Sequence, residues 1–277
     1  MRLWVELDGA RYAVAADHPL ELAQPLDFYG EQPRAFGLGR AQARAVEGGD
    51  FVGDVRRGGS VNCESIELIA HGHGTHTEGV GHISAERVPV GDLAPDPLMP
   101  AVLLRVATRT LGASGDSSEG KSSPDDRVIC TSELRSALQR ADVSPAFCRA
   151  IIIATSGEGA AAPLRDYSGT NPAYLTAEAV TWLLAQGCEH LLIDLPSIDR
   201  EDDGGTTPVH RAYFELSAVG AGPTDAGPRR TITELIDVPE SASEGPYFLS
   251  LRFARFMLDA SPSRPILYRA EPMPETR

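Results

Sequence analysis

The sequence predicts an α/β protein, a single domain with a central mixed β-sheet and covering helices. Strand-like and helix-like segments alternate between about residues 101 and 195, which is typical of helices packed on a sheet. A hairpin pattern opens the chain, and strand-like segments close it. The 277 residues are 42% hydrophobic and show no internal repeat, so we expect residues 1–277 to share one core.

The first elements are an antiparallel strand pair followed by irregular structure. Leu3 to Leu7 and Tyr12 to Ala15 flank Asp8-Gly9, a dipeptide suited to a tight hairpin turn. Residues 17–60 are rich in Pro and Gly, and we expect irregular structure there. Three aromatic side chains of this segment are candidates for a pocket wall, with ordinary packing against the sheet as the alternative: Phe28, Tyr29 and Phe36.

The middle of the chain supplies the sheet and its helices. Val61 to Ala70 reads as a strand that runs straight into a histidine-rich segment. Three more strands are expected at Ala101 to Ala107, Ala150 to Thr155 and Leu191 to Leu195. The polar segment 108–126 is expected to be a mobile surface loop.

Two helices separate these strands. Thr131 is the expected N-cap of a helix that runs to about Ala141. Thr176 is the expected cap of a second helix, which ends at Gly187. Tyr247 to Met257 and Ile266 to Arg269 read as closing antiparallel strands.

The charge and the cysteines limit the class of protein. A formal net charge of −14 leaves no basic excess for binding nucleic acid or an anionic membrane. The four cysteines form no Cys-x-x-Cys pair, and we expect reduced, mostly buried thiols. The acidic N-terminal segment does not resemble a signal peptide, and apolar runs are too short to span a membrane. A cytoplasmic protein is expected.

The strongest chemical signal is the segment from His71 to His82. It contains four of the seven histidines and Glu78, interleaved with glycines that allow several side chains to converge. Imidazole and carboxylate groups are preferred ligands of zinc, manganese and iron. His76 and Glu78 lie two residues apart, so on an extended segment they point to the same side. The pattern favours a metal site over a solvated Gly/His loop.

The segment from Gly74 to His82 resembles the signature of the putative cyclase superfamily, His-x-Gly-Thr-His-x-Asp-x-Pro-x-His. Asp194-Leu195-Pro196-Ser197-Ile198-Asp199 is similar to the family's Asp-x-Pro-Ser-x-Asp block. His210 and Glu234 match a downstream histidine and a late glutamate. The family includes kynurenine formamidases and isatin hydrolases, metal-dependent enzymes that act mostly on amides and cyclic amides.

The resemblance implies a partly barrel-like sheet of the swivelling β/β/α type, one or two zinc or manganese ions, and a homodimer or higher homo-oligomer. It makes His82 the catalytic general acid or base. Ser197 is expected to have a structural or substrate-contacting role, since no Gly-x-Ser-x-Gly elbow surrounds it. The implied metal ligands are His71, His76, Glu78, His210 and Glu234.

Three departures from the signature stand out. The family's first histidine falls on Gly72, with His71 and His73 on either side. A one-residue bulge would restore the ligand from His71, which we favour over His73. Glu78 replaces Asp, and Val80 replaces Pro, which leaves the number of ions open.

The chemistry expected is hydrolysis of a C–N bond in an amide, formamide or cyclic amide by metal-activated water. His82 would move the proton between water and the leaving group. Two alternatives stay open: a metal-dependent dehydratase or lyase, and a degenerate, non-catalytic member that binds a small molecule.

Overall fold

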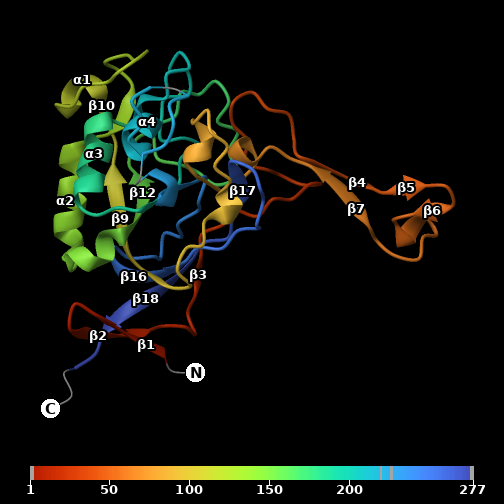
Figure 1. Cartoon of the computed structure of the whole chain (residues 1–277), viewed down its shortest axis with the longest axis horizontal. Coiled ribbons are helices and arrows are strands. Elements are labelled where there is room, and N and C mark those ends of the chain that lie inside the picture. Colours follow the sequence, from red (N-terminus) through yellow and green to blue (C-terminus); the bar gives the residue numbers. More distant parts are fainter. Residues whose placement is uncertain (1–2, 219, 225–226, 275–277) are drawn as a thin grey trace.

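The computed structural model describes residues 3–218, 220–224 and 227–274. It shows a body built on a large twisted sheet and a long arm that projects from it (Figure 1). The predicted α/β class with a central mixed sheet is confirmed. The assignment of the whole chain to one domain stays a prediction.

Within the described residues, eleven strands form the main sheet, in the order β1-β2-β18-β16-β9-β12-β14-β15-β8-β17, with β3 beside β18. Strands β9, β12, β14 and β15 run parallel, and the other neighbours are antiparallel. The strand bounds are β1 Leu3–Leu7, β2 Ala10–Val14, β3 Leu20–Glu21, β8 His76–Glu78, β9 Met99–Ala107, β12 Ala150–Ser156, β14 His190–Ile193, β15 Thr231–Glu234, β16 Gly245–Ser250, β17 Ala260–Pro262 and β18 Ile266–Pro272.

The parallel strands carry apolar side chains on both faces. Helices cover one of these faces (Figure 1). Ile151 and Ile193 pack toward the helices, whereas Ile152 and Leu192 enter a second apolar cluster on the other face. The helices are α1 Leu111–Ser114, α2 Thr131–Ala141, α3 Ala177–Ala185 and α4 Pro208–Phe214. The 3-10 helices are η1 Val55–Arg57, η2 Ala70–Gly72, η3 Val80–His82, η4 Val90–Asp92, η5 Pro145–Arg149 and η6 Gly227–Arg229.

The first hairpin and the second helix cap match their sequence signals. Asp8 and Gly9 both have positive φ angles, 50° and 76°, as the predicted tight turn requires. Thr176 accepts a hydrogen bond from the Ala179 N–H, 3.2 Å away, and caps α3. Cys130, and not Thr131, occupies the N-cap position of α2. The Asp116 carboxylate instead accepts from the Thr131 N–H and hydroxyl.

The projecting arm corrects two predictions, the irregular structure expected over residues 17–60 and the strand expected to run from residue 61 into the histidine-rich segment. Strands β4 Gln42–Ala45 and β7 Glu64–Glu67 pair as a hairpin, and β5 Glu47–Gly48 and β6 Phe51–Val52 extend it outward (Figure 1). The strand predicted over residues 61–70 is present as β7, but it is shorter and all four of its residues are exposed. Its alternating apolar residues lie on the arm, and the 3-10 helix η2 separates it from His76.

Two further segments bear on the predictions. Segment 108–126 contains α1 and β10 Arg109–Thr110, which pairs with β11 Arg127–Ile129 and through it with β13 Tyr174–Leu175. Its mobility stays a prediction. Strand β16 ends at Ser250, so the predicted strand to Met257 is too long. In the part of the chain that the structure describes, none of the helices has the length and apolar character to cross a bilayer.

Candidate metal centre

Strand β8 places His76 and Glu78 on the same face of the sheet, as the two-residue spacing predicts. His76 pairs with Glu234 of β15 in the strand register, and its Nε2 lies 3.5 Å from Glu234 Oε2. Thr77 points the other way and shares a hydrogen bond with Thr233. The His76 and Glu78 side chains have no solvent exposure, so the sheet itself holds this half of the site rigidly.

The 3-10 helix η2 brings His71 to the same place. His71 Nδ1 lies 2.9 Å from Glu78 Oε2. Between them the chain reverses through Gly74, whose φ of 108° favours glycine. The expected bulge in an extended strand is thus wrong in form: a helical turn, not a bulge, brings His71 to the site.

His82 lies at the end of η3, on the open side of the cluster. Its Nε2 is 3.8 Å from Glu78 Oε2, and its ring stacks on His71 with the centroids 4.1 Å apart. Val80, which replaces the family's Pro, is buried at the start of this turn. A Cβ at Gly81 would lie 2.2 Å from the Val88 carbonyl oxygen, so this turn tolerates only glycine at that position.

Helix α4 contributes His210 from the opposite side. His210 Nε2 lies 2.9 Å from Glu78 Oε1 and 3.7 Å from Glu234 Oε1. Its Nδ1 lies 2.6 Å from Asp199 Oδ2, and Asp199 also accepts from the backbone N–H groups of Val209 and His210. Asp199 therefore satisfies the first turn of α4 and fixes the His210 ring at the same time.

The donor set fits a divalent cation. Of the described side-chain atoms, His76 Nε2, His210 Nε2 and both Glu78 oxygens are buried and make no hydrogen bond of acceptable geometry, although they approach one another closely. One atom each from His71, His76 and Glu78 lies within 4.8 Å of the others, and the same holds for Glu78, His82 and His210. Buried ligand atoms that face each other without hydrogen bonding are expected where an ion binds.

In three of the histidine rings, the nitrogen that does not face the cluster (the outer nitrogen) lies within hydrogen-bond distance of an acceptor. His71 Nε2 lies 2.8 Å from Asp259 Oδ2, and His76 Nδ1 lies 3.0 Å from the Gly74 carbonyl. His210 Nδ1 meets Asp199. An outer acceptor leaves the inner nitrogen with its lone pair directed into the site, which is how ligating histidines are commonly oriented.

The electrostatics of the cluster favour the ionised forms of the Glu78 and Asp259 carboxyls. Burial lowers the pKa of His71, but its hydrogen bond to Asp259 and its close contact with the Glu78 carboxylate outweigh burial and raise the pKa to about 10. Burial opposes ionisation of Glu78, yet the charges of His82 and His210 hold its pKa well below the usual range. The pKa of Asp259 is likewise lowered by its hydrogen bonds to His71 and His82. Glu78 thus presents a negative charge in a fully buried position.

His73 is turned away from the cluster. Its Nδ1 accepts from the Ile69 N–H at 2.9 Å, so its Nε2 carries the proton and donates to the Gly39 carbonyl at 2.7 Å. Both ring nitrogens of His73 therefore hydrogen-bond to backbone groups. The geometry brings His71, not His73, into the group that surrounds Glu78.

The predicted pocket residues are more scattered. Tyr29 and Phe36 are 70% and 42% exposed, and the Tyr29 hydroxyl donates to Glu64 on the arm. Phe28 is half-buried. Ser197 Oγ accepts from the Asp199 N–H, so it supports the loop that holds His210. Their contact with a substrate stays a prediction.

Two functional candidates were missed from the sequence. Asp259 reaches both His71 and His82, at 2.8 and 3.3 Å, from 188 and 177 positions further along the chain, and no local motif marks it. Asp199 lies in the Asp-x-Pro-Ser-x-Asp block, which was its available signal. Asp194 of the same block points elsewhere: it accepts from the Thr155 N–H and hydroxyl and lines a cavity of about 470 Å³.

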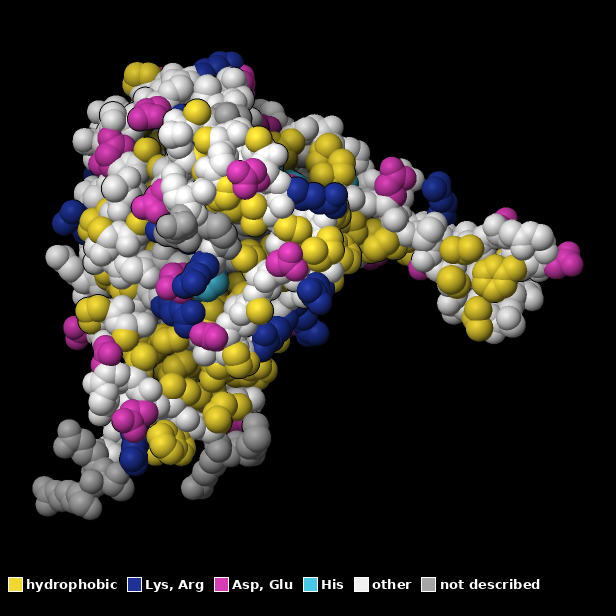
Figure 2. Space-filling view, in the orientation of Figure 1, with side chains coloured by type: hydrophobic (Ala, Val, Ile, Leu, Met, Phe, Trp, Pro, Cys, Tyr) yellow, Lys and Arg dark blue, Asp and Glu magenta, His cyan; other side chains and the backbone are white. Residues whose placement is uncertain are grey.

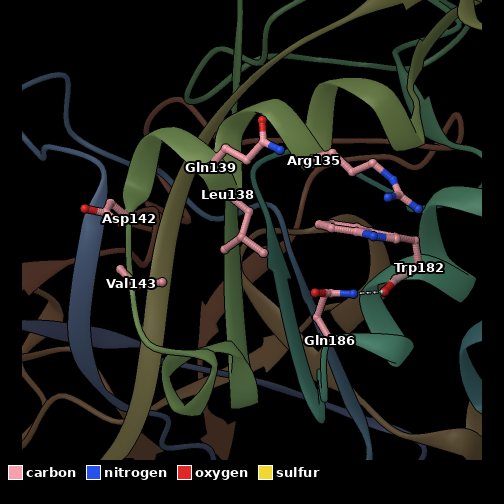
Figure 3. A pocket seen from close by; sticks show the side chains of 7 residues that line it. All are labelled: Arg135, Leu138, Gln139, Asp142, Val143, Trp182 and Gln186. Carbon is pink, nitrogen blue, oxygen red and sulfur yellow. Dashed lines mark hydrogen bonds between the residues drawn. The ribbon is translucent and has the colours of Figure 1, made fainter.

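A larger hollow, of about 510 Å³, lies between α2 and α3 (Figure 3). Arg135 lies over the Trp182 ring there, with the guanidinium carbon 5.5 Å from the ring centroid (Figure 3). Leu138 and Val143 complete its apolar side. None of the clustered histidines lines it, so this hollow is separate from the candidate metal centre.

Comparison with solved structures shows the fold. The chain is 14% identical to isatin hydrolase A from Labrenzia aggregata bound to benzyl benzoate, with a TM-score of 0.57, covering 91% of this chain and 93% of that one. A predicted metal-dependent hydrolase from Bacillus stearothermophilus is 16% identical, with a TM-score of 0.54 and coverage of 91% and 98%. A structure described as a novel cyclase gives a TM-score of 0.59 at 14% identity, covering 91% and 87%. These similarities confirm the cyclase-type fold.

The search of curated proteins gave no match. The sequence pattern of the family described as putative cyclase matches residues 16–200, more than half of the chain. This range contains the histidine-rich segment and Asp199, whereas His210 and Glu234 lie beyond it. The chain therefore belongs to the putative cyclase family.

Proposed function

We propose that this protein is a metal-dependent hydrolase that cleaves a C–N bond in an amide, formamide or cyclic amide. One observation carries the proposal: four histidines surround the buried Glu78, and three of them hold their outer nitrogens on fixed acceptors. The similar solved structures described as isatin hydrolase and metal-dependent hydrolase support the same reaction class.

The residues divide into two candidate ligand groups that share Glu78. His71, His76 and Glu78 would hold one zinc or manganese ion, and Glu78, His210 and Glu234 a second. A bound dication would acidify its water and polarise a substrate carbonyl. Since Glu78 is longer by one methylene than the family's Asp, it reaches both His71 and His210 with different oxygens.

His82 is the proposed proton carrier. Its side chain is 29% exposed, in contrast to His76 and His210, so it faces the side from which a substrate would enter. It would take a proton from the attacking water and return it to the leaving nitrogen. Imidazole suits this exchange because its ordinary pKa lies near neutrality.

Chelation and isotope labelling test the proposal. The protein is stripped with a chelator, reloaded with zinc or manganese, and assayed on formamides, cyclic amides and hydroxy acids in ¹⁸O-water. We expect activity on a C–N bond that is lost on stripping, restored on reloading, and accompanied by one solvent oxygen in the product. Activity that ignores the chelator contradicts the proposal, and a product without solvent oxygen favours the dehydratase or lyase alternative.

We also propose that two copies of the chain associate through the arm. An isolated two-stranded hairpin is only marginally stable, and hydrophobic side chains gather at its tip (Figure 2). The body offers a second exposed apolar group, Phe256 to Leu258, next to Asp259. The exposed apolar residues of the arm are Val46, Phe51, Val55, Val61 and Ile66.

Light scattering measures this association. Phe51→Glu combined with Val61→Glu should convert a dimer to a monomer, because charge on the apolar surface of the arm opposes its burial. Leu3→Glu, on the exposed β1 strand of the body, is the matched control and should leave the mass unchanged. A wild-type monomer at micromolar concentration contradicts the proposal.

A cytoplasmic location is part of the proposal. Cys130, Cys148 and Cys188 are buried free thiols, and Cys63 is exposed and unpaired. Free thiols are expected to persist in a reducing compartment.

A further inference from the structure

We infer that Asp259 is a positioning residue that orients both His71 and His82 through one carboxylate oxygen. The inference rests on the proposed function, since it assigns His71 to metal binding and His82 to proton transfer. It adds a residue outside the family signature, from a segment that the matched range 16–200 does not include.

The backbone fixes where Asp259 lies. Strand β17 follows it directly and pairs with β8, so that Ala260 is opposite Glu78. The Asp259 carbonyl also accepts from the Gly79 N–H at 3.2 Å. Asp259 is therefore held beside the end of β8, the strand that carries His76 and Glu78. Its carboxylate extends toward His71 and His82.

The contact with His71 sets the direction of that ring. Asp259 Oδ2 accepts from His71 Nε2 at 2.8 Å, while His71 Nδ1 faces Glu78 Oε2 at 2.9 Å. With the Nε2–H donated to Asp259, Nδ1 faces Glu78, and in the ion-bound protein its lone pair would be directed at the ion. His210 has the equivalent arrangement, with Asp199 as its outer carboxylate.

The same oxygen also reaches His82. His82 Nδ1 lies 3.3 Å from Asp259 Oδ2, and its Nε2 points toward Glu78. The two rings stack with 26° between their planes. One carboxylate oxygen thus orients two rings, so the direction of the proton carrier depends on the same group as the direction of a candidate ligand.

The exposure of Asp259 separates this role from a contribution to folding. Its side chain is 43% exposed, whereas that of Asp199 is 5% exposed. Exposed ion pairs contribute little to folding stability. Removing the Asp259 carboxylate should therefore change ring orientation and metal affinity while the protein stays folded.

Calorimetric titration of zinc into the stripped full-length protein tests the inference. We expect Asp259→Ala to weaken zinc binding about 10- to 100-fold with unchanged stoichiometry, the range typical of an outer-shell carboxylate. Asp259→Asn should fall between wild type and alanine, because its amide oxygen still accepts from Nε2–H. Asp92→Asn removes an exposed carboxylate paired with Arg255 and is the matched control, expected to bind like wild type.

NMR of the histidine ring C–H groups in the stripped protein supplies a readout that needs no metal. Asp259→Ala should shift the ring signals of His71 and His82, since their stacking depends on the shared oxygen, and leave those of His73 unchanged. Unaltered zinc affinity together with unaltered His71 and His82 signals overturns the inference. Loss of one bound ion in Asp259→Ala also overturns it, because Asp259 is then itself a ligand. If wild type binds neither zinc nor manganese, the proposed function fails, while the ring signals still test the positioning role.

Discussion

His210 and His71 approach Glu78 from opposite sides with the same arrangement but in different surroundings. Each directs one ring nitrogen to a Glu78 oxygen at 2.9 Å and holds the other nitrogen on an aspartate. On the His210 side both partners are buried, and Asp199 also binds two backbone N–H groups of α4. On the His71 side the histidine is 22% exposed and Asp259 is 43% exposed.

The difference shows that an aspartate that orients a histidine ring can contribute strongly to folding stability at one position and little at another. Asp199 stabilises the fold, since it accepts hydrogen bonds from two N–H groups in the first turn of α4. Asp259 belongs to the open side, where His82 also lies and where substrate would enter. We therefore expect changes on the His210 side to alter stability and function together, and changes on the His71 side to alter function alone.

Glu78→Gln should have the largest effect, because it removes the charge that both sides share. A buried carboxylate that interacts with three histidines is worth about 4 kcal/mol to its partners, or about 1,000-fold in zinc affinity. Competition against a zinc-sensitive dye measures the affinity. Glu86→Gln, an exposed glutamate, is the control. Retained affinity in Glu78→Gln would show that the two sides do not meet at Glu78.

His71→Ala and His73→Ala separate the two neighbours of Gly72. His71→Ala should weaken zinc binding by more than about 100-fold, the upper range for an outer-shell partner, since it removes a ligand. His73→Ala should bind zinc like wild type, because both of its nitrogens bond to the backbone of Ile69 and Gly39. The same dye competition compares them. The reverse ranking would assign the ligand to His73.

Asp199→Ala and Asp259→Ala test the difference in stability directly. Asp199→Ala leaves two backbone N–H groups and the His210 ring without their acceptor, and should cost about 3 kcal/mol in the free energy of unfolding. Asp259→Ala should cost less than about 1 kcal/mol. Urea unfolding in the presence of a chelator measures both without a contribution from metal. Equal losses would refute the contrast between the two sides.

Local signals in the sequence predicted the elements that depend on near neighbours. Asp8-Gly9 predicts its hairpin because the two positive φ angles are a property of the turn itself. The spacing of His76 and Glu78 predicts a shared face because side chains alternate along any strand. Thr176 predicts a helix start because the cap bond spans only three residues.

Residues that meet through distant pairing could not be predicted. The alternation of Ile66 and Leu68 is the same for an exposed arm strand as for a half-buried core strand, since periodicity does not say what lies on the apolar side. Asp259 meets His71 only because β17 adds to β8 at the edge of the sheet. That pairing is a property of the assembled fold, and no motif near residue 259 announces it.

His190, which lies outside the candidate metal centre, provides a buried histidine with a hydroxyl partner in place of a carboxylate, for comparison with His71 and His210. Its expected effect on stability is smaller than that of Asp199→Ala. It is buried at the start of β14, but its Nδ1 meets the neutral hydroxyl of Thr231. Burial lowers the pKa of His190 to about 4 from its usual 6.5, whereas the carboxylates raise that of His71. Between pH 6.5 and pH 4 the unfolded chain therefore binds the proton more readily than the folded protein does, and stability falls as the pH falls.

From this pKa difference, wild type should lose about 2 kcal/mol between pH 7 and pH 5 through His190 alone. Urea unfolding at both pH values, for wild type and His190→Gln, isolates the contribution, since glutamine does not titrate. The variant should show a pH dependence smaller by that amount. An identical pH dependence in both proteins would mean that protonation of His190 does not lower the free energy of unfolding. A neutral hydroxyl partner would then accommodate a charged buried histidine as well as the carboxylates beside His71 and His210 do.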